Sequence, residues 1–261
     1  MTDTERQTIQ ARTTRNTPDT AADAVAPPIE SVPAYAADPG DHEALLDDFL
    51  TENGDWEKYR TFSDDTTHVI HESQTLRIQL LHEADPRDDA CTVAAYVTPV
   101  SDRMWHLTLT ANTPAGLLNS LLISLAHGEW DTRLDSPITE KSVAQVAHPL
   151  TDAGWTPTTQ GRWLHWKSAQ GDAGLTLDAF AAKDPNASLT SWTIWAGDHP
   201  DRPTWAINAS TYTPAGLLAD LAEELAHGIG TRQTSPQQPA KHISQIRTAL
   251  PPRTAETSHR R

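Results

Sequence analysis

The sequence predicts an α+β protein of two tandem repeats, each a four-stranded antiparallel sheet with a leading helix and a C-terminal helix packed on one face. First, the frame Thr-Pro-Ala-Gly-Leu-Leu occurs at 113–118 and again at 213–218, and each copy is followed by Leu-Ala-His-Gly. Second, further landmarks such as Trp105 and Trp205 recur at the same offset. Third, apolar and polar residues alternate upstream of each frame, which is typical of half-buried strands. Landmarks at a fixed spacing indicate a duplicated structural unit.

The repeats are expected to occupy the middle of the chain. Residues 1–33 are rich in Thr, Ala, Pro and charge without apolar periodicity, which predicts a disordered N-terminal arm. The first repeat is expected at 34–130 and the second at 131–230. Each opens with a helical pattern, at 41–51 and at 140–150, and a Gly-Trp turn follows each helix. Residues 231–261 are expected to form a basic tail with a possible short helix at 241–250.

Four short alternating segments follow each leading helix. In the last of these segments in the first repeat, Trp105, Leu107 and Leu109 alternate with polar residues. Such a period of two predicts antiparallel strands with one apolar face. The strands are expected at 66–73, 75–82, 91–98 and 104–112 in the first repeat, and at 161–168, 174–181, 189–197 and 204–212 in the second.

The repeated frame predicts the closing helix of each repeat. Thr113 is expected to cap the helix with its hydroxyl, and Pro114 follows where no backbone donor is needed. Leucines then recur on one helical face, and Gly128 marks the end. His127 lies in the last turn, near the negative end of the helix dipole, so a structural role is expected for it. The frame is therefore interpreted as scaffold.

Composition limits the functional classes. The formal net charge is −15, with 29 acidic and 11 basic residues between 34 and 230, which disfavours generic binding to phosphate backbones. The single cysteine, Cys91, allows no internal disulfide and no cysteine-based metal cluster. No apolar run is long enough for a membrane span, and the N-terminus lacks the apolar core of a signal peptide. A soluble cytoplasmic protein is expected.

The sequence contains no recognisable catalytic motif. A phosphate-binding loop, a Gly-x-Ser-x-Gly elbow and a paired zinc motif are all missing. Cys91 starts a strand without a neighbouring acid–base partner, so a buried thiol is expected. We therefore expect a protein that is not an enzyme, with no cofactor and no metal site.

Candidate binding residues lie on the strands, out of phase with the core. In the second repeat this phase combines aromatic rings with polar groups, which is typical of a contact surface. These candidates are Trp163, His165, Lys167, Phe180, Trp195 and Tyr212. The first repeat offers a weaker version with Tyr96, which becomes equivalent to Trp195 if the following turn differs by one residue.

Landmarks in the sequence also resemble a known family. They are Tyr35 followed by Pro39-Gly-Asp41, the Gly-Trp turns, and Trp-x-(apolar) before Thr-Pro-Ala-Gly. Together they resemble the actinobacterial SPDY domain family, over about 35–230 and as two copies. The Ser-Pro-Asp-Tyr stretch of the family name is replaced by His71–Gln74 in one copy and by Lys167–Gln170 in the other. The resemblance implies an actinobacterial source and an unknown function, and it transfers no catalytic residues.

Two binding functions remain open. The first is a non-enzymatic interaction module whose aromatic sheet faces contact a protein partner or another copy of the chain. The alternative is single-stranded nucleic-acid binding on the same surface, since the four strands and helix of each repeat are similar to the Whirly architecture. A small ligand is a third option. On the first hypothesis, replacing Trp163 and Trp195 by alanine is expected to abolish partner capture with little change in thermal stability.

Overall fold

The computed structural model describes residues 28–128, 138–184 and 189–234. The expected arm up to residue 27 and the possible helix at 241–250 lie outside the described residues. The elements from Ile29 to Thr234 form one compact unit.

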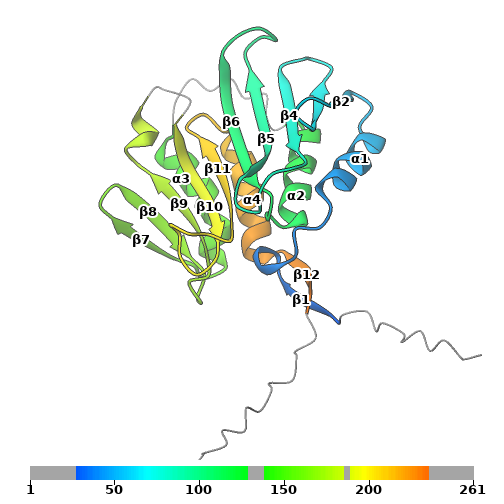
Figure 1. Cartoon of the computed structure of the whole chain (residues 1–261). Helices are drawn as coiled ribbons and strands as arrows, with labels where there is room; N and C mark the ends of the chain where they lie inside the picture. Colours follow the sequence, from blue (N-terminus) through cyan, green and yellow to red (C-terminus); the bar gives the residue numbers. More distant parts are fainter. Residues whose placement is uncertain (1–27, 129–137, 185–188, 235–261) are drawn as a thin grey trace, which may run out of the picture. The chain divides into compact units, whose positions relative to one another are not determined.

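One ten-stranded antiparallel sheet runs through this unit, with all helices on one of its faces (Figure 1). Its strands follow the order β2-β3-β4-β5-β6-β11-β10-β9-β8-β7. The first repeat supplies β2 (Trp56–Thr61), β3 (Thr66–His71), β4 (Leu76–Leu81), β5 (Asp89–Tyr96) and β6 (Arg103–Thr110). The second supplies β7 (Thr156–Gln160), β8 (Trp163–Lys167), β9 (Ala173–Asp178), β10 (Thr190–Ala196) and β11 (Trp205–Ser210).

The α+β class and the two-repeat organisation are confirmed, but the strand count is corrected from four to five in each repeat. The missed strands, β2 and β7, are the two edges of the sheet. All five residues of β7 are exposed, and only the first residue of β2 is buried. A strand at the sheet edge with so little buried surface does not need alternating apolar residues. The prediction depended on that alternation, so it did not find these strands.

The two repeats join edge to edge through β6 and β11. Their register pairs Leu109 with Ile207, Thr108 with Asn208 and Leu107 with Ala209. Thr108 and Asn208 are equivalent positions of the repeats, so a local twofold axis passes between them. Two hydroxyls extend the junction reciprocally: Ser210 Oγ accepts from the His106 amide at 2.9 Å, and Thr110 Oγ1 accepts from the Ala206 amide at 3.0 Å.

The helices are α1 (His42–Glu52), α2 (Ala115–Ala126), α3 (Glu140–Asp152) and α4 (Ala215–His227). The expected leucine stripes of α2 and α4 are buried in a shared core, together with the apolar phase of the strands. The expected threonine caps are wrong: α2 begins after Pro114, and no side chain caps it. The Thr213 hydroxyl instead donates to the His106 carbonyl at 3.2 Å, across the junction of the repeats. The frame therefore serves the junction as well as the helix.

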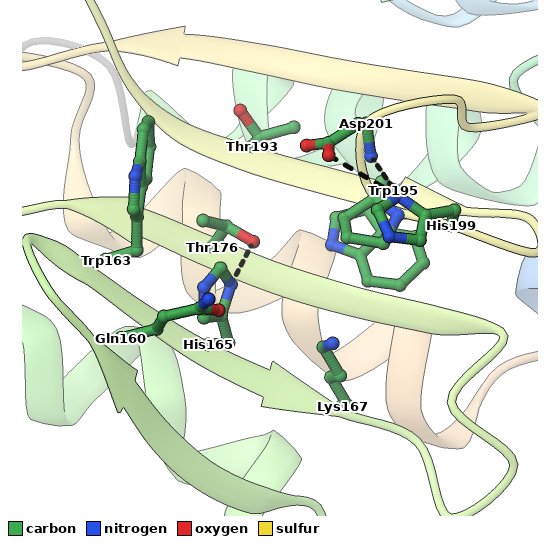
Figure 2. Close-up of a pocket in the computed structure, with 10 residues that line it drawn as sticks. Gln160, Trp163, His165, Lys167, Thr176, Thr193, Trp195, His199 and Asp201 are labelled. Carbon is green, nitrogen blue, oxygen red and sulfur yellow. Dashed lines mark hydrogen bonds and ion pairs between the residues drawn. The ribbon is translucent and has the colours of Figure 1, made fainter.

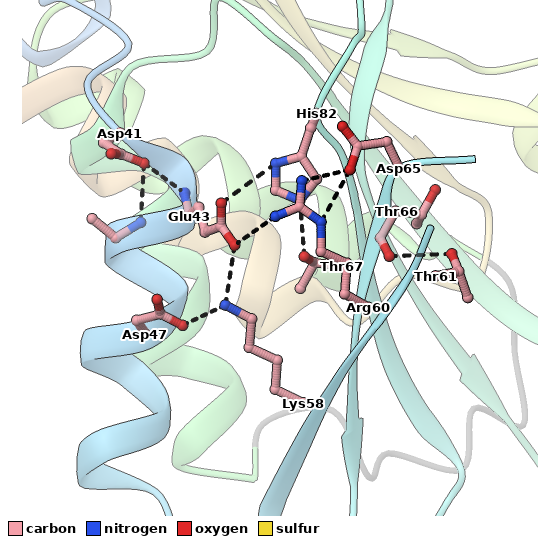
Figure 3. Close-up of polar contacts among 11 residues, drawn as sticks. Asp41, Glu43, Asp47, Lys58, Arg60, Thr61, Asp65, Thr66, Thr67 and His82 are labelled. Carbon is pink, nitrogen blue, oxygen red and sulfur yellow. Dashed lines mark hydrogen bonds and ion pairs between the residues drawn. The ribbon is translucent and has the colours of Figure 1, made fainter. Parts of the chain in front are cut away.

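Helix α1 is attached to the edge of the sheet by an ion-pair network (Figure 3). Glu43 lies within 3.2 Å of Lys58 and 3.8 Å of Arg60, both on β2, and 3.5 Å from His82. Lys58 also contacts Asp47 at 2.6 Å. Exposed ion pairs add little individually, but a network directs β2 toward the helix and protects this edge.

His42, at the start of α1, is buried and makes a polar contact with the segment that precedes α2. Its Nε2 lies 2.8 Å from the Thr113 carbonyl oxygen, so the neutral ring donates there. Burial lowers the pKa of His42 below its ordinary value, although the Thr113 carbonyl opposes this shift. The unfolded chain therefore takes up a proton more readily than the folded protein does.

Above about pH 6.5, the pKa of an unperturbed histidine, we expect the full contribution of neutral His42 to the free energy of unfolding. As the pH falls toward the lower pKa of the folded state, the unfolded chain is protonated first, and the free energy of unfolding should decrease. Urea unfolding at a series of pH values between about 7 and 5 measures this slope. His42→Gln should flatten it, whereas His127→Gln, a change of an exposed histidine, should leave it in place. An unchanged slope in His42→Gln would contradict the assignment.

The two ends of the unit are joined by a small second sheet. Strand β1 (Ile29–Pro33) pairs antiparallel with β12 (Ile229–Gln233). Nearby, Trp205 Nε1 donates to the Tyr35 carbonyl at 3.0 Å. The boundaries expected at residues 33 and 230 are therefore wrong, because each falls inside or beside a strand. These short and largely exposed strands pair only with each other, across about 200 residues, and such pairing leaves no local pattern in the sequence.

Candidate functional site

The sheet face opposite the helices is lined by polar residues. One residue from each of the ten strands pairs with the next to form a continuous row across this open face. In strand order the row is Tyr59, His68, Gln79, Thr92, Thr108, Asn208, Thr193, Thr176, His165 and Thr158. No member carries a fixed charge. With strands about 4.8 Å apart, the row extends over roughly 40 Å.

A pocket of about 530 Å³ opens on this face within the second repeat (Figure 2). Strands β7 to β10 form its floor, and the loop between β10 and β11 contributes one side. The pocket brings together four of the residues expected from the sequence, namely Trp163, His165, Lys167 and Trp195. Its other lining residues are Gln160, Thr176, Thr193, His199, Pro200 and Asp201.

Trp195 is not the exposed contact residue expected from the sequence, since only 1% of its surface is accessible. Its strand position faces Gly174 on β9. A Cβ atom at Gly174 would lie 2.8 Å from the indole Cζ2, so the ring lies directly over this glycine. The indole nitrogen is buried without a hydrogen-bond partner in the described structure. This burial argues against the expectation that Trp195 can be removed at little cost in stability.

His165 and Lys167 lie on β8, beside Trp195. The His165 Nδ1 is 3.0 Å from the Thr176 hydroxyl. Burial, and then the positive charge of Lys167, lower the pKa of His165, so its ring is neutral at pH 7. Within the described ranges, no carboxylate lies within ion-pair distance of Lys167. The fixed charge of the strand floor is therefore positive, whereas Asp201, on the loop side of the pocket, carries a negative charge that opposes the lowering of the His165 pKa.

Trp163 and Phe180 lie at the rim. The Arg162 guanidinium carbon is 4.7 Å from the Trp163 ring centre and 5.7 Å from that of Phe180. The same guanidinium contacts the buried carboxylate of Asp178 at 2.9 Å. Trp163 is 36% exposed and Phe180 68% exposed. This cluster presents two aromatic surfaces to solvent beside the pocket, although Phe180 does not line it.

Two expected residues lie elsewhere. Tyr212 is half-buried and packs against the core cluster, so it belongs to the scaffold. Tyr96 lies in the first repeat, with the Arg77 guanidinium carbon 4.7 Å from its ring centre. The suggested equivalence of Tyr96 and Trp195 is wrong. In the second repeat Trp195 pairs with Gly174 and Ala206, and in the first repeat Ala94 pairs with Arg77 and His106. The equivalent of Trp195 is therefore Ala94, and Tyr96 lies beyond a register shift that follows Ala95.

Sequence reasoning missed Gly174 and the loop residues that shape the pocket. Gly174 could have been noticed, because a glycine inside a strand often marks a close approach of another group. His199 and Asp201 come from a loop, for which the sequence shows no periodicity. The distance from His199 Nδ1 to Asp201 Oδ2 is 3.6 Å. Their position over the sheet depends on tertiary folding.

Other candidate chemistry is limited in the described ranges. Cys91 is buried, and desolvation raises its thiol pKa to about 12. Among the residues with described positions, no three His, Cys, Asp or Glu side chains form a group able to hold a metal ion. None of the described helices has both the length and the apolar character needed to cross a membrane.

Comparison with known proteins yields a family and no function. Residues 72–129 and 167–230 match the model of SPDY, described as a domain of unknown function (DUF317). The two segments start at the end of β3 and at the end of β8, and each continues through the closing helix of its repeat. No curated protein and no solved structure matches the chain. The chain therefore contains two tandem segments that match the SPDY family model, one in each repeat.

Proposed function

We propose that the protein is a non-enzymatic, cytoplasmic binding module that uses the open face of its second repeat to contact a protein partner. The observation that carries this proposal is the rim cluster, in which Trp163 and Phe180 flank Arg162 beside a pocket. Exposed aromatic rings next to an arginine are typical of the energetic centre of protein interfaces. The pocket offers a place for one side group of the partner.

Charge supports a protein partner over a nucleic acid. Arg162 is held by Asp178, and the Arg77 guanidinium donates to the Pro99 carbonyl at 2.7 Å. Lys167 is left to attract an anion at the pocket. A phosphate backbone binds through several clustered cations, whereas one cation beside aromatic rings suits a single acidic group in an otherwise apolar contact.

Photo-crosslinking tests the proposed surface. Benzoylphenylalanine placed at Phe180 is expected to give a discrete adduct in cells of the source organism, because this ring lies at the proposed contact. The same group at Phe62, which is 90% exposed in the turn between β2 and β3, serves as the matched control. Trp163→Ala, added to the Phe180 variant, should reduce the adduct by about tenfold or more, the usual effect of truncating an aromatic residue at the centre of an interface.

The adduct mass identifies the partner class. An adduct of twice the chain mass means that the partner is a second copy, and sedimentation velocity should then show a concentration-dependent dimer. A different mass means another protein. Equal labelling from Phe62 and Phe180, or an adduct insensitive to Trp163→Ala, would contradict the proposal.

Single-stranded nucleic-acid binding is the second candidate. The observation in its favour is the long row of uncharged polar residues, in which the Tyr59 ring stacks on His68 at 4.8 Å with an angle of 11°. Stacking rings and polar edges on a sheet can hold unpaired bases. Quenching of tryptophan fluorescence by oligo(dT), saturable and weakened by salt, would support this candidate.

A further inference from the structure

The pocket of the second repeat has polar groups that its own residues leave unused. The Thr193 hydroxyl donates to Asn208 Oδ1 at 3.1 Å, and His165 is engaged with Thr176. Asp201 faces His199. Two donors remain without acceptors in the described structure: the Lys167 ammonium, which forms no ion pair there, and the buried indole N–H of Trp195.

These two donors lie on one line across the sheet. Lys167 pairs with Gly174, and Gly174 pairs with Trp195. With adjacent strands about 4.8 Å apart, the backbones of Lys167 and Trp195 are separated by roughly 10 Å, and both side chains rise from the same face. Their donor groups can therefore approach one bound group from opposite sides. Because Gly174 lacks a side chain, the Trp195 ring lies over it, and Cε2, the ring carbon bonded to the indole nitrogen, is 2.9 Å from where a Cβ atom of Gly174 would be.

The first repeat has no such arrangement. The strand pairings align Lys167, Gly174 and Trp195 with Ile70, Arg77 and Ala94. In that repeat Arg77 fills the place of the glycine, and its guanidinium is engaged by Tyr96 and by the Pro99 carbonyl. The two copies share the sheet but differ at all three positions. The first copy has a smaller pocket of about 290 Å³ at this place, lined by Ile70 and Arg77, so the donor pair and not the pocket itself is specific to the second copy.

An uncompensated buried donor costs stability, and an acceptor that reaches it restores the lost hydrogen bond. A carboxylate has two acceptor oxygens and a negative charge, so it can accept from the indole N–H and the ammonium together. The Trp163 ring at the rim offers an apolar surface to a flat group. Since the indole nitrogen is covered, a lining side chain must turn aside. His199 lines the pocket from the neighbouring loop, and its side chain is 63% exposed (Figure 2).

We propose that this pocket binds a carboxylate attached to an aromatic ring, with Lys167 and Trp195 Nε1 as the donors and Trp163 against the ring. The proposal rests on the proposed function, because it names the group by which the same face recognises its partner. The carboxylate can belong to a free aromatic acid or to the C-terminal aromatic residue of a partner chain.

The test follows the indole N–H resonances of the ¹⁵N-labelled full-length protein during titration with benzoate. The Trp195 resonance is assigned by its NOE contacts to Gly174, so no variant has to fold for the assignment. It is expected to move downfield in a saturable manner as the hydrogen bond forms. Trp56 and Trp105 also have buried, unpartnered indole nitrogens, but they lie in the core, so their resonances should stay unchanged.

Charge is tested with matched probes and variants. Benzamide is expected to bind more weakly than benzoate, and benzylamine not at all. Lys167→Gln should weaken benzoate binding by about tenfold or more, the usual effect of losing a charged hydrogen bond. Lys183→Gln removes the same charge at an exposed position outside the pocket and should have no effect. A Trp195 resonance unmoved by benzoate, or moved equally by benzylamine, would overturn the proposal.

The peptide Ala-Ala-Phe, with a free or an amidated C-terminus, separates the two sources. Binding of the free-acid peptide but not of the amide identifies a C-terminal carboxylate, and binding of benzoate alone identifies a free acid. The result is independent of the crosslinking experiment. Benzoate binding without a Phe180 adduct removes only the proposed protein contact, and an adduct without benzoate binding removes only the carboxylate assignment.

Discussion

Replacing Trp195 by alanine is expected to lower the free energy of unfolding by about 3–5 kcal/mol, the usual cost of truncating a fully buried tryptophan. The indole covers Gly174 and is 1% exposed, so its removal leaves a cavity against the strand. Trp163→Ala, on the same face of the neighbouring part of the sheet, should cost only about 1 kcal/mol. Trp163 is 36% exposed, and its main contact is the cation–π pair with Arg162.

Urea unfolding followed by far-ultraviolet circular dichroism measures both variants without relying on tryptophan fluorescence. The two substitutions remove the same side chain from the same face, so each is the control for the other. Similar small losses from both would mean that Trp195 is accessible in solution. Similar large losses would mean that Trp163 is part of the packed structure, and the rim cluster would then no longer be a contact surface.

This pair of tryptophans shows how far the sequence predicts the site. Alternation placed Trp163 and Trp195 on the same face of the sheet, and the structure confirms that placement. Alternation alone does not specify what lies over a residue. Trp195 is buried because a glycine on the neighbouring strand lets the ring lie against the backbone, and because the loop between β10 and β11 borders the same pocket. Both reasons are tertiary.

The fold was predictable where its elements bury an apolar face. The leucine stripes of α2 and α4 and the inner strands follow the periodicities of the helix and the strand, so their positions in the sequence were clear. The edge strands β2 and β7 bury little, and β1 and β12 pair with distant partners. Such strands are specified by backbone hydrogen bonds to their neighbours, which do not depend on residue type.

The duplication accounts for the way in which the repeats meet. Tandem copies of one unit present the same edge strand twice, and antiparallel pairing of these edges about a twofold axis makes a self-complementary contact. Strands β6 and β11 meet in this way, at Thr108 and Asn208. Each repeat thereby covers the edge that would otherwise be open, and the leucines of α2 and α4 share one core behind the junction. The chain is an internal dimer of its own repeats.

The junction hydroxyls give the second large effect. Ser210→Ala leaves the part-buried backbone amide of His106 without its acceptor, and Thr110→Val does the same to the buried amide of Ala206. We expect each substitution to cost about 1–3 kcal/mol, the desolvation penalty of an unpaired buried donor. The double variant should lose close to the sum, because the two bonds lie on opposite sides of the local axis and share no partner.

Urea unfolding of the two single variants and the double variant measures these costs as a thermodynamic cycle. Thr108→Val is the matched control: this threonine lies at the centre of the junction, is half-buried, and its hydroxyl makes no hydrogen bond to a described residue. A loss in Thr108→Val as large as in the other two would show that the cost does not come from the two hydrogen bonds between hydroxyls and backbone amides. If the repeats are one cooperative unit, unfolding of the double variant should remain a single transition with an unchanged denaturant slope. Separate transitions would show instead that each repeat is stable alone, since weakening the shared edge would then uncouple two independent folding units.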